Sequence, residues 1–220
     1  MIKNQYWNNF VKENRGLWHY DPMVTSQDYT YIGRLKTDFN PLLELMEDDR
    51  NFTKHVMVQN IKEYEGELSE RLKAFTEWGF NEYNTQSLQM TDDDFPEIFK
   101  GYKKFADFEQ SKVVALKQHP GQALPWHEDT LVGFKKQYNV PEDRKVVRYS
   151  LFLEDWNWGH YFAVGNNVIH QWKQGDIIQF PPKIHHVTCN AGMVPKLTMT
   201  VTGTETEQSI KLKKNGKFEI

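Results

Sequence analysis

The residues best suited to chemistry stand near the middle of the chain, where His127 and Asp129 are separated by one residue. This pair follows a strand-like run, 112–118, and a Pro-Gly turn. In an extended segment, residues two apart point to the same face, so this imidazole and carboxylate could bind one metal ion. A second His-x-Asp pair, His19 and Asp21, has no apolar strand before it, and the sequence therefore favours His127 and Asp129.

A second histidine ligand is available in the segment that begins at Gly175. An apolar run follows this glycine, Pro181-Pro182 turns the chain, and His185 and His186 open the next expected strand. Adjacent residues of a strand face opposite sides, so only one of these two histidines should reach the metal. Two histidines and one carboxylate leave positions of the metal open, which is the ligand set typical of non-haem Fe(II) oxygenases.

Lys196 stands ten residues after His186 and would share a strand face with Thr198. A lysine that points into a core needs a compensating anion, because burial of an unpaired ammonium is costly. A dicarboxylate would supply that anion, whereas the plainer interpretation is an exposed lysine at the start of a strand. Because the expected metal ligands precede Lys196 at a spacing that would put it on the strand beside His186, we favour the buried anchor.

The apolar pattern changes near residue 110 and predicts two structural regions. Before it, apolar residues recur every three to four positions, which predicts mostly helix and loop over 1–110. After it, short runs of β-branched and aromatic residues alternate with Gly, Pro and Asn turns, which predicts a jelly-roll or barrel. The expected strands are 112–118, 146–153, 159–164, 167–172, 176–180, 185–189 and 196–201.

Smaller elements are expected at both ends of the chain. Helices are predicted around Tyr6 and Phe10, over 38–46 and 51–80, and after Asp92-Asp93-Asp94. The tail, 202–220, is predicted to form a hairpin around its Asn-Gly turn.

Composition limits the class of protein. A length of 220 residues suffices for a full-sized core, and we expect a single domain over 1–220. The net charge is −3 with scattered Lys and Arg, which argues against a nucleic-acid surface. Cys189 is the single cysteine and suits a reducing cytoplasm, and no run has the length of a signal-peptide core or a membrane helix. We therefore expect a cytoplasmic protein without nucleic-acid or membrane partners, whose oligomeric state the sequence leaves open.

The order of these motifs resembles the Fe(II)/2-oxoglutarate-dependent dioxygenases, and within them the aspartyl/asparaginyl β-hydroxylase and proline hydroxylase group. The shared features run from the approach to His-x-Asp, through an Arg-containing strand and a Trp and Gly-Asp segment, to the second histidine and a basic residue. In this chain they are Leu116, Pro120, Gly121, His127, Asp129, Arg148, Leu151, Trp172, Gly175, Asp176, Phe180, His186, Asn190 and Lys196. The resemblance covers about residues 112–201, with lysine where the group usually has arginine, and the spacing from Phe180 selects His186 over His185.

The resemblance implies both a fold and a metal centre. The fold would be mainly β with α, with a double-stranded β-helix (jelly-roll) core and a largely helical N-terminal half packed on it. Fe(II) would be held by His127, Asp129 and His186. The aromatic loop 154–160 could line the substrate entrance or serve in packing alone.

The resemblance also implies the co-substrates. Lys196, with the hydroxyl of Thr198 as a second donor, would bind the far carboxylate of 2-oxoglutarate. Arg148 is a further candidate for a carboxylate of the co-substrate or the substrate, and a surface ion pair is an equal interpretation of it. With O2 as oxidant, the reaction would hydroxylate an unactivated C–H of an amino acid or peptidyl side chain and release succinate and CO2.

Two other classes of protein fit part of the pattern. Gly175, Pro181, His186 and Asn190 fit the second cupin motif, which would indicate a cupin-type metal-binding module or isomerase without 2-oxoglutarate. The first cupin motif, however, has His-x-His with a later Glu, and Asp129 stands in its place here. A metal-free jelly-roll used for protein contacts is disfavoured because the ligand set is complete.

Overall fold

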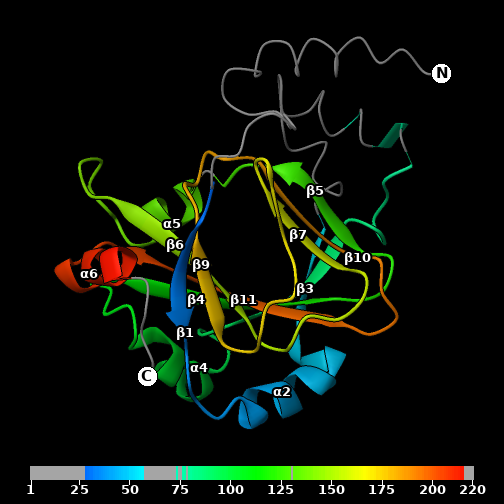
Figure 1. The fold of residues 1–220 in the computed structure, drawn as a ribbon, viewed down its shortest axis with the longest axis horizontal. Helices are drawn as coiled ribbons and strands as arrows, with labels where there is room; N and C mark the ends of the chain where they lie inside the picture. Colours follow the sequence, from blue (N-terminus) through cyan, green and yellow to red (C-terminus); the bar gives the residue numbers. More distant parts are fainter. Residues whose placement is uncertain (1–27, 57–72, 74–75, 78, 130, 216–220) are drawn as a thin grey trace.

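The computed structural model describes residues 28–56, 73, 76, 77, 79–129 and 131–215. Two antiparallel sheets face each other, and most of the helices lie on the outer side of the larger sheet (Figure 1). The larger sheet has seven strands in the order β1-β9-β6-β11-β4-β3-β2, and the smaller has four in the order β5-β10-β7-β8.

The bounds of the elements are as follows. The larger sheet contains β1 (Thr30–Arg34), β2 (Thr53–Val56), β3 (Gln86–Thr91), β4 (Ser111–Gln118), β6 (Val146–Phe152), β9 (Asp176–Gln179) and β11 (Lys196–Thr204). The smaller sheet contains β5 (Ala123–His127), β7 (His160–Val164), β8 (Asn167–Ile169) and β10 (His186–Asn190). The helices are α2 (Asn40–Glu47), α4 (Pro96–Lys103), α5 (Val132–Gln137) and α6 (Glu207–Asn215), with a short 3-10 helix η1 (Asp49–Asn51).

Strands β4 to β11 build a double-stranded β-helix. The order β9-β6-β11-β4 in one sheet faces β5-β10-β7-β8 in the other, so neighbouring strands are distant in the sequence except in the hairpin of β7 and β8. This is the arrangement of a two-sheet jelly-roll with Greek-key connections. It confirms the predicted jelly-roll core, and all seven strands predicted after residue 110 have a counterpart in it.

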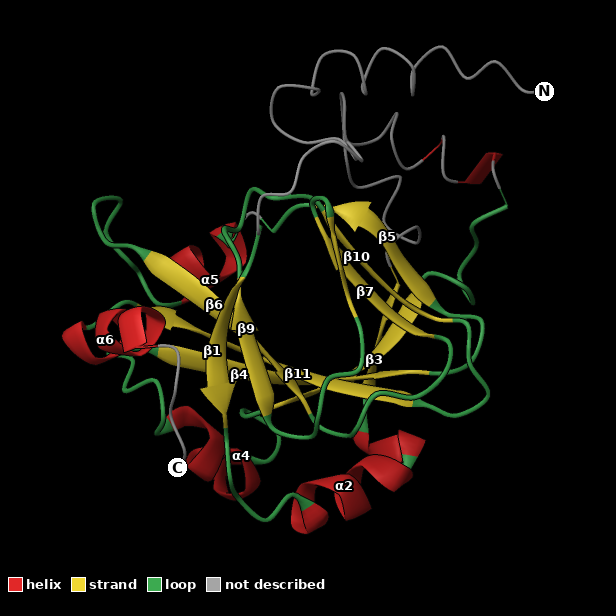
Figure 2. Cartoon of the chain, viewed as in Figure 1, coloured by secondary structure: helices red, strands yellow, loops and turns green. Residues whose placement is uncertain are grey.

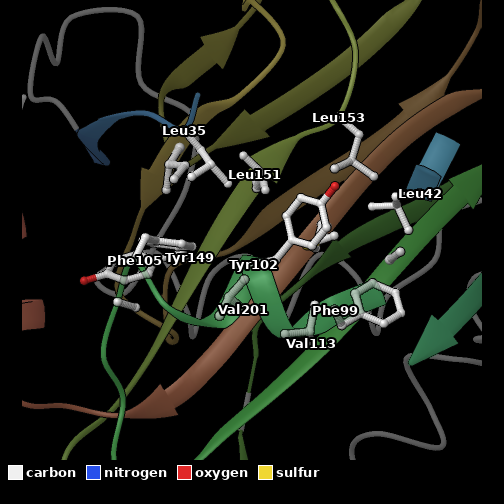
Figure 3. Close-up of a cluster of buried hydrophobic side chains, with 14 of the residues drawn as sticks. Leu35, Leu42, Phe99, Tyr102, Phe105, Val113, Tyr149, Leu151, Leu153 and Val201 are labelled. Atoms are coloured by element: carbon white, nitrogen blue, oxygen red, sulfur yellow. The ribbon is translucent and has the colours of Figure 1, made fainter. Parts of the chain in front are cut away.

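Successive side chains of the central strands face opposite sides of the larger sheet and contribute to two separate apolar cores. Met199 and Val201 of β11 are buried on the outer face of the larger sheet, together with Tyr149 and Leu151 of β6 (Figure 3). Phe152 of β6 instead joins the cluster between the two sheets. The side chains between the outward-facing residues of β11 therefore point into the barrel, because successive strand residues face opposite sides.

Helices α2, α4 and α6 cover the outer face of the larger sheet (Figure 2). Both α2 and α4 have a proline in the first turn, Pro41 and Pro96, whose fixed φ suits that position. Leu42 of α2 and Phe99 of α4 are fully buried, and Leu212 of α6 joins the same cluster. Full burial of a large apolar side chain stabilises by about 1.5–3 kcal/mol. This packing fixes the larger sheet from outside and leaves its inner face free to line a site.

The N-terminal half is less helical than predicted. Helices α2 and α4 confirm the two predicted at 38–46 and after Asp94, but β1, β2 and β3 are strands that extend the two ends of the larger sheet. Their partners lie far along the chain, and such pairing leaves a weak local pattern. The helix predicted around Tyr6 and most of the segment 51–80 lie outside the described residues.

The hairpin predicted over 202–220 is wrong where the structure describes this tail. Strand β11 continues to Thr204, and α6 follows. The backbone N–H of Thr206 donates to Ser209 Oγ at 2.9 Å, and that of Ser209 donates to Thr206 Oγ1 at 3.3 Å. This reciprocal cap is a helix-start signal, and it outweighs the turn signal of the Asn-Gly pair. In the described part of the chain, no helix is long and apolar enough to span a bilayer.

Candidate metal centre

Three side chains from neighbouring strand ends converge at one end of the barrel. His127 ends β5 and His186 begins β10, and the two residues are directly paired across the antiparallel ladder. Their ring centroids are 4.2 Å apart. Asp129 follows β5, and its Oδ2 lies 3.9 Å from His186 Nε2. Within the part of the chain that the structure describes, this is the one group whose ligand atoms all lie within 4.8 Å of one another.

Backbone carbonyls fix both imidazoles in an orientation that suits metal binding. His127 Nδ1 lies 2.7 Å from the carbonyl oxygen of Pro125, and His186 Nδ1 lies 3.1 Å from that of Ile184. A carbonyl only accepts, so each Nδ1 carries the proton and each Nε2 keeps its lone pair. Metal-binding histidines are commonly held in this way by their second nitrogen.

The charges of the three groups also fit a divalent cation. Burial, reinforced by His127, lowers the pKa of His186 to about 4, so this imidazole is neutral at neutral pH. Burial alone would raise the pKa of Asp129, but Arg148 and the two histidines outweigh it, so the pKa is lowered and the group is a carboxylate. Neutral imidazoles and a carboxylate are the protonation states that bind a metal. The donor set therefore fits a metal with open coordination positions.

Arg148 lies inside the barrel mouth rather than on the outer surface. Its Nη1 is 2.7 Å from Asp129 Oδ2, and its Nε donates to Thr202 Oγ1 at 2.9 Å. The sequence had left a carboxylate anchor and a surface ion pair as equal interpretations. The structure instead places Arg148 against a candidate metal ligand, with 28% of its side chain exposed.

Lys196 is a buried cation on the inner face of β11. It is 1% exposed, and its ammonium donates to the carbonyl oxygen of Tyr161 at 2.7 Å and to Thr188 Oγ1. The rings of Phe162 and Trp172 lie 5.4 and 5.9 Å from its Nζ. Among the described residues no carboxylate forms an ion pair with it. Burial therefore lowers the pKa of Lys196 to about 7.

Two polar residues between the metal ligands and Lys196 were missed by the sequence analysis. Thr188 Oγ1 donates to Gln118 Oε1 at 3.0 Å, and Gln118 Nε2 donates to the carbonyl oxygen of Thr188 at 3.3 Å. Thr188 could have been found, because it stands two residues after His186 and so shares its strand face. Gln118 depends on the register of β4 against β11, where it is paired with Lys196.

A small cavity and a wide groove meet at Asp129. The inner cavity, of about 70 Å³, is lined by the three candidate ligands together with Thr188 and the predicted Thr198. The outer groove, of about 740 Å³, has an apolar lining of Leu131, Val132, Val146, Pro181 and Pro182 and a rim of mixed charge. A ligand could therefore approach the candidate metal centre along this groove.

The aromatic loop 154–160 and the remaining histidines lie elsewhere. The loop 154–160 does not line the entrance at the metal end, because it precedes β7 at His160, whereas the partner of His186 is Val164 at the far end of that strand. His119 pairs with Asp49, and His170 is exposed. His19 and Asp21 are outside the described residues.

Several solved structures are similar to part of the chain. A sugar phosphate isomerase of the cupin superfamily from Silicibacter pomeroyi is 15% identical, over 72% of this chain and 74% of that chain, with a TM-score of 0.38. A predicted oxalate decarboxylase from Thermotoga maritima is 10% identical, over 54% and 81%, with a TM-score of 0.34. A cupin 2 conserved barrel domain protein from Salinispora arenicola is 10% identical, over 46% and 69%, with a TM-score of 0.29.

These likenesses are too low to carry an argument about activity. No protein-family model and no curated protein matches the chain. The assignment of a double-stranded β-helix therefore rests on the order of the strands, and the assignment of a metal centre on the three converging side chains.

Proposed function

We propose that this protein is an Fe(II)- and 2-oxoglutarate-dependent dioxygenase that hydroxylates an unactivated C–H of an amino acid or peptidyl side chain. One observation carries the proposal: a two-histidine, one-carboxylate group shares the barrel interior with a buried lysine that no carboxylate neutralises in the described part of the chain. The three ligands account for a metal. The lysine accounts for a dicarboxylate, which a metal-binding module alone would not require.

The spacing of the two features supports a dicarboxylate. From His186 to Thr188 the strand advances two residues, about 7 Å, and the ammonium of Lys196 contacts Thr188. A molecule with a carboxylate at each end could therefore contact the metal with one end and Lys196 with the other. Because the inner cavity is small, such a molecule would replace Thr188 as a partner of Lys196.

Separate groups of residues would bind the metal and the co-substrate. His127, Asp129 and His186 would hold Fe(II), which when bound supplies the activation of O2 that side chains cannot perform. Lys196 would bind the far carboxylate of 2-oxoglutarate, and Thr198, which lines the inner cavity with the three candidate ligands, would donate a second hydrogen bond.

The remaining interior residues would orient the reactants and exclude water. Arg148 lies close enough to Asp129 to contact a carboxylate bound beside the metal ligands. The apolar lining of the outer groove would receive the substrate and exclude water from the side of Asp129. Succinate and CO2 would be the co-products.

The experiment that tests the proposal is an anaerobic titration of Fe(II) and 2-oxoglutarate, followed by the visible metal-to-ligand charge-transfer absorption. Wild type should develop the band, and His186→Ala should abolish it with the metal. Lys196→Met should bind the metal normally and lose the band at moderate 2-oxoglutarate. His170→Ala is the matched histidine control, because that side chain is exposed and away from the site.

The other outcomes are equally informative. Metal binding without any effect of 2-oxoglutarate would refute the dioxygenase and leave a cupin-type metal module. Absence of metal binding would refute the metal centre as well. Where the band forms, release of succinate during aerobic turnover with candidate amino acids and peptides identifies the substrate.

A further inference from the structure

A second cavity lies on the opposite side of the larger sheet from the barrel interior. Its volume is about 610 Å³, within the range of small-molecule sites. Leu197 lines it, whereas the preceding residue, Lys196, points into the barrel. The cavity lies between α2, the loop after β6 and the turn before β11, so it shares no lining residue with the candidate metal centre.

The lining combines an apolar floor with carboxylates. Leu43, Met46 and Leu197 form part of the floor. Glu154 is half-buried, and its carboxylate has no hydrogen bond or ion pair within the described residues. Burial raises the pKa of Glu154 although Lys117 opposes the shift, which means that its charge lacks full compensation. A cation that entered the cavity would supply that compensation.

The charges around Glu154 leave the cavity acidic. Glu47 and Asp155 also line it, and Asp155 is paired at the rim with Lys173 at 2.8 Å. Among the described residues of the lining, the one lysine is Lys117, whose Nζ is already engaged, 2.8 Å from Asp49 Oδ1 and 2.7 Å from the carbonyl oxygen of Met46.

The histidine of the lining does not change this balance. Burial lowers the pKa of His160, so this imidazole adds no positive charge at neutral pH. Its Nε2 contacts the carbonyl oxygen of Val194 at 3.2 Å and is not directed at a carboxylate.

The geometry argues against a chelated metal ion as the cation. Among the described residues, only His127, Asp129 and His186 bring three ligand atoms within 4.8 Å of one another. The carboxylates of this second cavity are therefore too dispersed to form a chelate. Dispersed carboxylates above an apolar floor suit an organic cation, whose apolar stem is buried while its charged head meets the acids.

We propose that this cavity binds a protonated amine carried on an apolar stem, with Glu154 as the principal partner of the ammonium group. Such a group occurs in free alkylamines and in lysine side chains of other proteins. The site is independent of the chemistry proposed for the barrel.

The test uses the full ¹⁵N-labelled protein and n-hexylamine, observed by amide chemical shifts. The shifts should concentrate on residues that line the cavity, such as Leu43, Asn157 and Leu197. Hexan-1-ol, which has the same stem without charge, should bind about tenfold more weakly, because a charged hydrogen bond is lost. Hexanoate should not bind. Binding of Nα-acetyl-lysine amide as tightly as hexylamine would identify a protein side chain as the source of the amine, and much weaker binding would identify a free amine.

Matched variants separate a specific site from general attraction to an acidic protein. Glu154→Gln keeps the shape of the side chain and removes its charge, so it should weaken the binding of hexylamine about tenfold. Glu142→Gln should bind like wild type, because that carboxylate is exposed and lies outside the cavity. The proposal is overturned if folded Glu154→Gln binds like wild type, if hexanoate and hexylamine bind alike, or if the shifts lie outside this cavity.

Discussion

Replacement of Lys196 by methionine should make the ligand-free protein more stable while it removes the co-substrate site. The ammonium is buried among rings and two oxygen acceptors, and no carboxylate among the described residues neutralises it. Methionine keeps the length of the side chain and removes the charge. Replacement of a buried charge by an apolar side chain of similar size is commonly neutral or stabilising.

The size of the effect follows from the pKa. Burial lowers the pKa of Lys196 from 10.5 to about 7, a difference of about 3.5 units, which corresponds to about 5 kcal/mol at most. The loss of hydrogen bonds to Tyr161 and Thr188 reduces this gain. We therefore expect the free energy of unfolding at about pH 7 to rise by roughly 1–4 kcal/mol in Lys196→Met.

The pH dependence has a definite sign. Between about 7 and 10.5 the unfolded chain keeps the proton of Lys196 and the folded chain releases it. The unfavourable contribution of Lys196 is thus fully present below about pH 7 and disappears towards pH 10.5, so this residue makes wild-type stability rise across that window. The advantage of Lys196→Met should shrink over the same window.

The assay is urea unfolding followed by circular dichroism, in the presence of a metal chelator, at about pH 6, 7 and 9. Lys117→Met is the matched control, because Lys117 is also buried but pairs with Asp49 and two backbone carbonyls. The free energy of unfolding of Lys117→Met should fall by about 1–3 kcal/mol. If Lys196→Met is destabilised like Lys117→Met, or binds 2-oxoglutarate like wild type, the reasoning about an uncompensated buried cation is refuted.

Three further predictions concern the scaffold, and each is checked by chemical or thermal unfolding. Gly159→Ala should destabilise the protein by about 1–3 kcal/mol, because φ is +86° and backbone atoms of the neighbouring loop fill the space of a Cβ. In Gly101→Ala of α4 the added Cβ meets nothing within 4 Å, so this variant should stabilise the protein by up to about 1 kcal/mol. Equal effects of the two substitutions would contradict this reasoning. Leu151→Ala should lower the free energy of unfolding by about 2–5 kcal/mol, because it leaves a cavity in the outer core. A loss below about 1 kcal/mol would show that neighbouring side chains repack to fill the cavity. Ser209→Ala should lose about 0.5–2 kcal/mol through its cap with Thr206, and unchanged helical content and stability would argue against that cap.

The strands of the barrel could be predicted because each carries its own local signal. Runs such as 146–152 are β-branched and aromatic, and Gly or Pro turns separate them. Strands β1, β2 and β3 could not be predicted in this way. The sequence of β2, Thr53–Val56, is mostly polar and largely exposed, and its strand state depends on pairing with Gln86–Thr91.

The candidate site was predictable to the extent that strand alternation determines it. One-residue spacing put His127 and Asp129 together, and the spacing from Phe180 indicated His186. The contact between Arg148 and Asp129 was not predictable, because it depends on how β6 faces the end of β5 across the barrel. Sequence alone also gave no sign of the second cavity, since its lining comes from four separate segments.

The direct pairing of His127 with His186 has a consequence for the folding of the chain. The two residues are 59 positions apart (186 − 127), and β5 is an edge strand of the smaller sheet. A single ion bound by both residues only in the folded chain would stabilise the fold by mass action, by about 4 kcal/mol when the free ion is at about a thousand times its dissociation constant. Amide hydrogen exchange in β5 should then slow when the metal binds. Removal of the metal should cause this edge strand to fray before the rest of the sheet.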